Sequence, residues 1–313
     1  MGQRVTEHGI GREVAPVHSE RGAEPTDLRE QLAFFSAERV VNVASVPQRS
    51  PLRYPGGKTW LVPRIRAWIA RLGYRPGLFI EPFAGGGIAA LTVIFEDLAD
   101  YAVMCERDED VAALWQLVLR DADWLISRIL SFEMTADQVD GVLLKEPRSL
   151  HEHGFATLIR NRVQRGGIMA KGASRMKNGE NGKGLASRWY PQTLARRVAE
   201  IHRRRDRITF VQGNGFDLIA GYANDPTAVF FVDPPYTAGG KRAGKRLYAY
   251  NDVDHEALFA LMGRVRGSFL TTYDDAVEVR QLAAEQGFSV ERVPMTNTHH
   301  EKQYELLITH SRS

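Results

Sequence analysis

The chain has 313 residues, of which 43% are hydrophobic and 25% are charged, so it holds enough apolar material for a full core. No apolar run is long enough for a transmembrane helix, and the first residues lack the apolar stretch of a signal peptide, so no membrane association is expected. The single cysteine, Cys105, cannot form an internal disulfide, and we expect a cytoplasmic protein.

The formal net charge is only +3, but the charge is unevenly distributed. Between Arg160 and Arg207 there are 14 Lys or Arg residues and 3 Asp or Glu residues, whereas the remainder of the chain is acidic. A basic segment on an acidic body suggests a polyanionic partner. A solvated basic surface is the alternative, and charge alone does not decide between the two.

Apolar and polar patterns predict an N-terminal extension followed by an α/β domain. Residues 1–49 are expected to be peripheral, with one amphipathic helix at Thr26–Arg39. Buried strands are predicted at Gly77–Ile80, Ala102–Cys105, Ile208–Val211, Val229–Val232, Phe269–Thr272, Phe288–Val293 and Tyr304–Thr309. Helices are predicted at Ile88–Asp97, Asp110–Leu119, Asp254–Arg266 and Ala276–Gln286. This alternation indicates an open α/β sheet, and the last two strands, which have no helix between them, are expected to form an antiparallel hairpin.

The alternation lapses between residues 130 and 205, where glycines and basic residues accumulate. We interpret 130–205 as an inserted lobe, and 50–129 together with 206–313 as the α/β domain. The glycine-rich part, Gly166–Gly184, is expected to become ordered on binding a partner.

A glycine-rich turn follows the first predicted strand, where the sequence reads EPFAGGG at residues 81–87. Consecutive glycines let the backbone pass close to a ligand, and ligands of open α/β sheets bind at the carboxyl ends of the strands. Glu106 ends the next strand, 21 residues after Gly85, and its carboxylate can accept both hydroxyl protons of a ribose. A tight turn followed by a surface Glu is the alternative, but the spacing favours a nucleoside pocket.

Several features favour S-adenosylmethionine over a dinucleotide. The turn lacks the full dinucleotide spacing of glycines, and Glu81 would repel a pyrophosphate. S-adenosylmethionine has no phosphate, and its ammonium can meet a carboxylate. Upstream, in the sequence RYPGGK at 53–58, Tyr54 could pack on the cofactor and Lys58 could pair with its carboxylate, although an ordinary loop would explain this segment too.

The predicted strand Val229–Val232 leads directly into Asp233-Pro234-Pro235-Tyr236. Prolines have no N–H, so their carbonyls can face a ligand as acceptors. The Asp233 carboxylate and the Pro234 carbonyl could hold the two hydrogens of an aromatic amino group and localise its lone pair for attack on a methyl donor. Tyr236 could stack on an extruded base. A rigid strand-end turn is the alternative.

At these motifs the chain resembles the DNA adenine methylase family, the Dam-like enzymes of the alpha group, over residues 51–309. The glycine motif, the basic lobe and the catalytic motif follow one another in the alpha order. The resemblance implies a Rossmann-like, S-adenosylmethionine-dependent methyltransferase sheet with a DNA-recognition lobe at 130–205. It implies methyl transfer to the N6 amino group of adenine in double-stranded DNA, after the base is flipped out.

The resemblance also implies roles for individual residues. The catalytic residues would be Asp233, Pro234, Pro235 and Tyr236. The cofactor-binding residues would be Tyr54, Lys58, Glu81, Phe83, Gly85, Gly87, Glu106, Phe216 and Asp233. The DNA-binding residues would be Asn161, Arg162, Lys171, Arg175, Lys177 and Lys183. No metal is expected.

The chain also departs from the family pattern. Gly215 stands where the family often has an acid before the aromatic residue, so Asn214 or Asp217 would have to contact the adenine edge of the cofactor. The loop Ile168–Trp189 does not look like that of GATC-specific enzymes. The target sequence, the oligomeric state and the presence of a cognate restriction enzyme therefore stay open.

Two other functions are compatible with the motifs. A related enzyme could methylate cytosine N4 or a glutamine amide, although those enzymes more often carry Ser or Asn at the position of Asp233. A binding protein could keep the fold and lack activity, although the intact sequence from Asp233 to Tyr236 argues against it.

Overall fold

The computed structural model describes residues 45–54, 57–169, 173–176, 179, 182, 184–235, 253–296 and 302–310. Most of the N-terminal extension, including the helix predicted at Thr26–Arg39, lies outside these ranges. So do four residues predicted to act in the site, Lys171, Lys177, Lys183 and Tyr236. No helix in the described ranges is long and apolar enough to cross a membrane.

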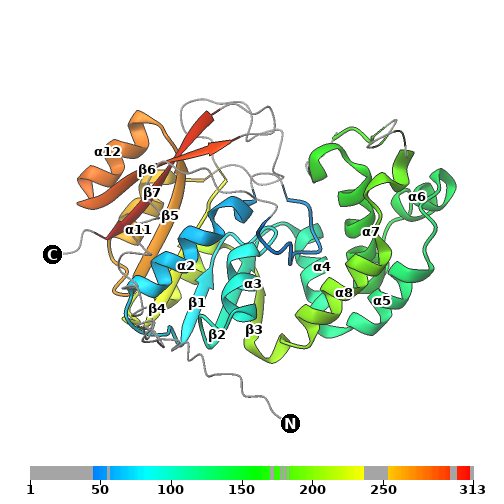
Figure 1. Cartoon of the computed structure of the whole chain (residues 1–313), viewed down its shortest axis with the longest axis horizontal. Coiled ribbons are helices and arrows are strands. Elements are labelled where there is room, and N and C mark those ends of the chain that lie inside the picture. The colour runs from blue at the N-terminus through cyan, green and yellow to red at the C-terminus, as the bar shows by residue number, and fades with distance from the viewer. Residues whose placement is uncertain are drawn as a thin grey trace, which may run out of the picture. The chain divides into compact units, whose positions relative to one another are not determined.

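The core of the fold is a seven-stranded sheet with the order β3-β2-β1-β4-β5-β7-β6 (Figure 1). Its strands are β1 Leu78–Glu81, β2 Tyr101–Glu106, β3 Ile208–Gln212, β4 Ala228–Val232, β5 Ser268–Asp274, β6 Phe288–Thr296 and β7 Lys302–His310. The first five are parallel, whereas β7 lies between β5 and β6 and is antiparallel to both. All seven predicted strands are confirmed, and so is the predicted antiparallel pairing of the last two.

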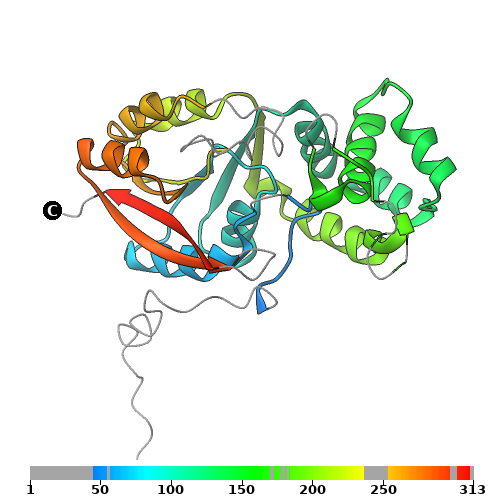
Figure 2. The same ribbon diagram turned by 90° about the horizontal axis from the view of Figure 1, so that it is seen from above.

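Helices cover both faces of the sheet (Figure 2). Because side chains alternate along a strand, Phe79 belongs to the apolar core on one face and its neighbour Ile80 to the core on the other. The first core includes α2 (Val62–Arg71) and α3 (Ile88–Phe95), and the second includes α9 (Gly215–Tyr222), α11 (His255–Met262) and α12 (Val277–Glu285). Strands buried on both faces explain the continuous apolar runs in the sequence.

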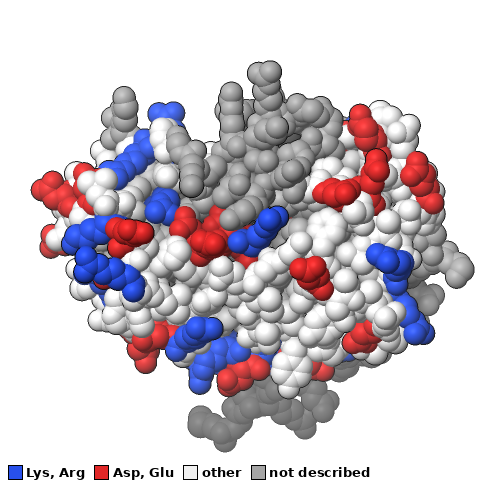
Figure 3. All heavy atoms as spheres, turned by 180° about the vertical axis from the view of Figure 1, so that it is seen from behind, with Lys and Arg blue, Asp and Glu red and all other residues white. Residues whose placement is uncertain are grey.

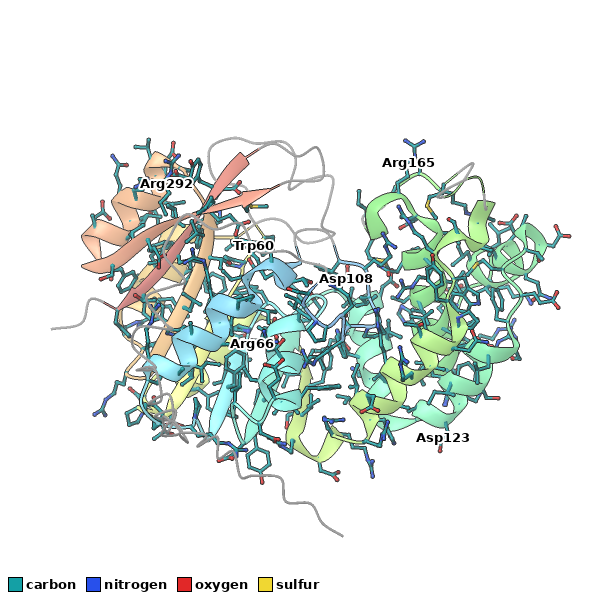
Figure 4. The ribbon with its side chains drawn as sticks, viewed as in Figure 1. Trp60, Arg66, Asp108, Asp123, Arg165 and Arg292 are labelled. Atoms are coloured by element: carbon teal, nitrogen blue, oxygen red, sulfur yellow. The ribbon has the colours of Figure 1, made fainter. Side chains whose placement is uncertain are left out.

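Polar residues at the carboxyl edge of the sheet start the helices that follow the strands. Asp108, labelled in Figure 4, caps α4 (Glu109–Arg120) by accepting from the backbone N–H groups of Asp110 and Val111. Asn214 caps α9 in the same way, and Asp254 caps α11. These caps fix where each loop turns at the edge where the candidate site lies.

Between α4 and β3 the chain forms a helical lobe. Its helices are α5 (Ala122–Ser131), α6 (Ala136–Leu143), α7 (Leu150–Val163) and α8 (Pro191–His202). Helix α7 packs closely on α4 because Gly154 has no side chain; a Cβ there would lie 2.9 Å from the Leu117 side chain and 3.0 Å from the Ala113 carbonyl. The sequence indicated an insertion here but not its helices, and much of the predicted glycine-rich loop lies outside the described residues.

Candidate active site

A cavity of about 1030 Å³ lies at the carboxyl ends of the parallel strands. Glu81 at the end of β1, Glu106 at the end of β2 and Asp233 just after β4 all line it. Residues of the lobe, including Arg162 and Arg197, line it as well. The cavity therefore brings together the glycine motif, the carboxylate that ends β2 and the first three residues of the predicted catalytic motif.

The glycine turn between β1 and α3 requires glycine for two reasons. Gly85 and Gly87 have positive φ angles of 47° and 64°, which residues with a side chain rarely adopt. A Cβ on Gly85 would also lie only 2.6 Å from the ring of Tyr54. The carbonyl of Gly85 accepts a hydrogen bond of 2.9 Å from Trp115 Nε1, which holds the turn in place. Tyr54, which was predicted to pack on the cofactor, thus packs directly on the glycine turn.

Glu106 holds the loops around the predicted ribose site. Its Oε2 accepts from Gly85 N at 2.9 Å, and its Oε1 accepts from the N–H groups of Arg107 and Asp108 at 2.8 and 2.9 Å. Burial raises the pKa of Glu106 to about 6. Since each carboxylate oxygen can accept two hydrogen bonds, Oε2 retains capacity for a ribose hydroxyl.

Aromatic and amide groups line the cavity beyond Glu106. The rings of Phe83 and Phe216 meet edge to face, with centroids 6.2 Å apart. Asn214 also lines the cavity while its Oδ1 accepts from Phe216 N. Asp217 is absent from the described lining, so Asn214 is the better placed of the two residues expected to replace the missing acid.

Glu81 is buried, and its carboxylate is committed to α3. Its Oε2 accepts from Ala90 N at 2.7 Å, near the amino end of that helix. Burial is the main reason that the pKa of Glu81 is raised to about 8, and the negative charge of Asp233 adds to it. Glu81 therefore shapes the turn directly, and its predicted role toward a cofactor ammonium stays a prediction.

Asp233 is fixed by two side chains from different elements. Lys58, only 2% exposed, places its Nζ 2.9 Å from Asp233 Oδ1. Thr272 on β5 donates to the same oxygen at 2.7 Å. Lys58 was predicted to pair with a cofactor carboxylate, whereas in the structure it pairs with Asp233.

Glu305 on β7 completes this polar cluster. It is 6% exposed, and its Oε2 lies 3.8 Å from Lys58 Nζ, which is too long for a hydrogen bond. That oxygen has no hydrogen-bond partner among the described residues. Burial is the first cause of a Glu305 pKa raised to about 7, which the cation of Lys58 moderates. In the sequence, Glu305 stood out only as part of a segment that resembles the family. The contact of Thr272 with Asp233 could have been predicted, because the predicted strand that ends at Thr272 lies beside the strand before Asp233.

The lobe holds the segment 50–54 against the cavity. Asn161 on α7 accepts from Arg53 N at 2.9 Å and donates to Arg53 O at 2.8 Å. Arg162 donates to the carbonyl of Pro51, and Arg197 on α8 donates to the carbonyl of Ser50 at 3.1 Å. The residues that precede Tyr54 are thus held in place by the lobe.

These contacts revise the roles expected for the Asn-Arg pair. Asn161 is 0% exposed and its amide bonds the backbone of Arg53 and Gly167, so it has a structural role here and its direct contact with DNA stays a prediction. Arg162 is 4% exposed and lines the cavity rather than the outer surface. Arg175 forms an ion pair with Asp140. The three lysines predicted to bind DNA, Lys171, Lys177 and Lys183, lie outside the described ranges.

The order of the strands, the antiparallel β7 and the glycine turn after β1 define a Rossmann-like sheet of the S-adenosylmethionine-dependent methyltransferase type. The predicted fold class is therefore confirmed. S-adenosylmethionine is the cofactor of this class.

No family model matches the chain, and no curated protein matches its sequence. Among solved structures, it is similar to a methyltransferase from Geobacter sulfurreducens, with 12% identity, 93% of each chain covered and a TM-score of 0.37. It is also similar to a precorrin-6y C5,15-methyltransferase from Geobacter metallireducens, with 9% identity over 80% of this chain and 87% of the other, and a TM-score of 0.34. The B. subtilis M1A22 tRNA methyltransferase TrmK matches with 10% identity over 80% and 66%, and a TM-score of 0.32. Similarity at this level does not bear on activity or substrate.

Proposed function

We propose that the chain is a site-specific DNA methyltransferase that transfers a methyl group from S-adenosylmethionine to the N6 amino group of adenine. The observation that supports this most directly is the position of Asp233 and Pro234. Both line the same cavity as the glycine turn and Glu106, so the residues proposed to hold the amino group share one space with those proposed to hold the nucleoside.

The residues present fit the cofactor at its nucleoside end. Glu106 would hold the ribose, Phe83 and Phe216 would flank the adenine ring, and the Gly85 turn would allow close approach of the amino acid part. When bound, S-adenosylmethionine supplies an electrophilic methyl group on its sulfonium. The cavity volume of about 1030 Å³ is at the upper end of the range of ligand pockets, roughly 300–1,000 Å³, which supports room for a second group such as a base.

Asp233 and Pro234 would act on the target amino group by accepting its hydrogen bonds. Lys58 and Thr272 both contact Asp233 Oδ1, so the carboxylate is oriented before the substrate arrives. Fixed acceptors of this kind lower the barrier because they need not reorganise during the reaction. Tyr236 is proposed to stack on the base, which must leave the duplex at a cost of a few kcal/mol to reach an enclosed site.

The proposed partner is double-stranded DNA, held by the basic lobe, in the cytoplasm. Methylation of cytosine N4 is the nearest alternative activity, because the same acceptors could hold that amino group.

Long-read sequencing of DNA from cells that express the chain tests the proposal. We expect N6-methyladenine in one short sequence context, and none in cells that express Asp233→Ala. The purified variant should still fold, with a lower melting temperature because Lys58 loses its partner, and should bind S-adenosylhomocysteine. N4-methylcytosine would select the alternative activity, and unmodified DNA with methylated RNA would overturn the DNA substrate.

A further inference from the structure

Several arginines of the lobe and its borders have acidic partners. Arg160 pairs with Asp110 and Arg175 with Asp140, while Arg204 and Arg207 pair with Glu200 and Asp97. The face of the molecule seen in Figure 3 likewise shows Lys and Arg side chains interspersed with Asp and Glu. Part of the excess of positive charge in this segment is therefore compensated within the fold.

Arg162 and Arg197 differ from these residues. Among the described residues no carboxylate pairs with either one, and their hydrogen-bond partners are the carbonyls of Pro51 and Ser50. The Nε of Arg162 is buried without a partner in the described part of the chain. Burial and the charges of Arg53, Arg197 and Arg188 lower the pKa of Arg162 to about 9. Burying cations close to one another without a counter-ion is unfavourable, unless an anion binds there.

The amino end of α8 faces the same part of the cavity. Tyr190 stands at the N-cap position and provides no side-chain cap, and no acid occupies the first turn. Thr193 in that turn and Tyr190 both line the cavity. The free N–H groups and the dipole at the start of a helix favour an anion. Two guanidinium groups that no described carboxylate neutralises thus line the same cavity as a helix start without a side-chain cap.

We propose that Arg162, Arg197 and the amino end of α8 form a binding site for a phosphodiester group of the nucleic-acid substrate. This inference rests on the proposed function and makes it more specific. A phosphate is favoured over a small carboxylate because all three elements belong to the lobe, and Tyr190, 56% exposed beside them, provides a ring on which a neighbouring base can stack. A phosphate at this wall would lead the strand into the cavity that contains Asp233.

Arg197→Gln is the decisive variant because Arg197 is only partly buried, whereas replacement of Arg162 endangers folding. We expect duplex affinity to fall about tenfold, which corresponds to the removal of one charge-assisted hydrogen bond. The log–log salt dependence of binding should become shallower by about 0.9. Arg197→Lys keeps the cation and should keep the salt dependence.

Arg196→Gln is the matched control, because Arg196 is the neighbouring residue on α8 and is exposed, outside the described cavity lining. It should change affinity no more than about twofold, as expected for a screened surface charge. Arg165, which points away from the lobe in Figure 4, serves as a second control through Arg165→Gln.

Fluorescence titrations of a labelled duplex at several salt concentrations, with calorimetry of S-adenosylhomocysteine, separate the outcomes. Arg197→Gln also removes the hydrogen bond to the Ser50 carbonyl, so a small loss of cofactor binding is expected with either outcome. Reduced duplex affinity together with a shallower salt dependence would support the site. Reduced cofactor binding with unchanged duplex binding would assign these residues to the cofactor carboxylate and overturn the proposal. Unchanged salt dependence for Arg197→Gln overturns this site alone, whereas a wild-type chain that binds no nucleic acid overturns the proposed function itself.

Discussion

Lys58 Nζ and Asp233 Oδ1 lie 2.9 Å apart and join the predicted cofactor segment to the predicted catalytic motif. Lys58 is almost fully buried, so its loss leaves the carboxylates of Asp233 and Glu305 without their cation. We expect Lys58→Met to lower the free energy of unfolding by about 3–5 kcal/mol, as measured by urea denaturation. The double variant Lys58→Met/Asp233→Asn should be less destabilised than the sum of the single variants, and additive effects would contradict this coupling.

Glu305 should make the protein less stable as the pH rises. Its pKa is raised to about 7, so between about pH 4.5 and 7 the folded state binds a proton that the unfolded state releases. Its contribution is present in full below the unfolded pKa and is lost as the pH rises through 7, a change of about 3 kcal/mol. Glu81 and Glu106 act in the same direction, since burial raises their pKa values to about 8 and 6.

Thermal melting from pH 5 to pH 8 tests this dependence. Glu305→Gln stays neutral throughout and should flatten the decline, whereas Glu256→Gln on the exposed side of α11 should keep it. A decline of unchanged slope in Glu305→Gln would show that Glu305 does not titrate differently on folding.

Glu106→Ala should weaken the binding of S-adenosylhomocysteine by about 1.5–3 kcal/mol, the usual value of a hydrogen bond to a charged group. The structure adds a second reason, because the same change removes the acceptor of Gly85 N and loosens the glycine turn. Calorimetry provides the measurement, with the exposed Glu109→Ala as control. Equal affinities for wild type and Glu106→Ala would place the ribose elsewhere.

Asn161→Ala should weaken cofactor binding although Asn161 is outside the described lining of the cavity. Its amide holds both the N–H and the carbonyl of Arg53, next to the Tyr54 ring on the glycine turn. We expect a loss of about 1–3 kcal/mol in stability and a higher KM for S-adenosylmethionine. Reduced duplex affinity with an unchanged KM would instead favour a direct DNA contact by Asn161.

Duplex binding should depend less on salt when four basic residues of the lobe are neutralised together: Lys171, Arg175, Lys177 and Lys183. The log–log slope should fall by roughly 0.9 for each phosphate that these cations neutralise in the wild type. Arg175 should contribute least, because it already pairs with Asp140. Cofactor affinity should change little. An unchanged salt dependence together with impaired cofactor binding would mean that the DNA lies elsewhere.

The sheet could be predicted from the sequence because its strands are short apolar runs that end in distinctive polar residues. The runs before Glu81, Glu106 and Asp233 place those carboxylates at one edge once the strands are taken as parallel, and all three line one cavity. The pattern also identified β6 and β7, since no helix separates them.

The partners of those residues could not be predicted, because they come from distant segments. Asn161 and Arg53 are 108 residues apart in the chain, and a local motif cannot reveal that the buried amide of one bonds the backbone of the other. Lys58 illustrates the same limit. Its sequence context suggested a contact with a ligand, but in the fold the carboxylate of Asp233 lies beside its ammonium group.

The hydrogen bonds from Asn161, Arg162 and Arg197 to residues 50–53 also determine whether the lobe can be exchanged for another. The lobe enters and leaves the fold between α4 and β3, so a chimera could replace it without cutting a parallel strand. A foreign lobe that lacks these donors would leave the backbone of 50–53 without its anchors, and the cavity beside that segment would be poorly formed. A chimera that works should therefore exchange segment 50–54 together with the lobe, although the two are separate in the sequence.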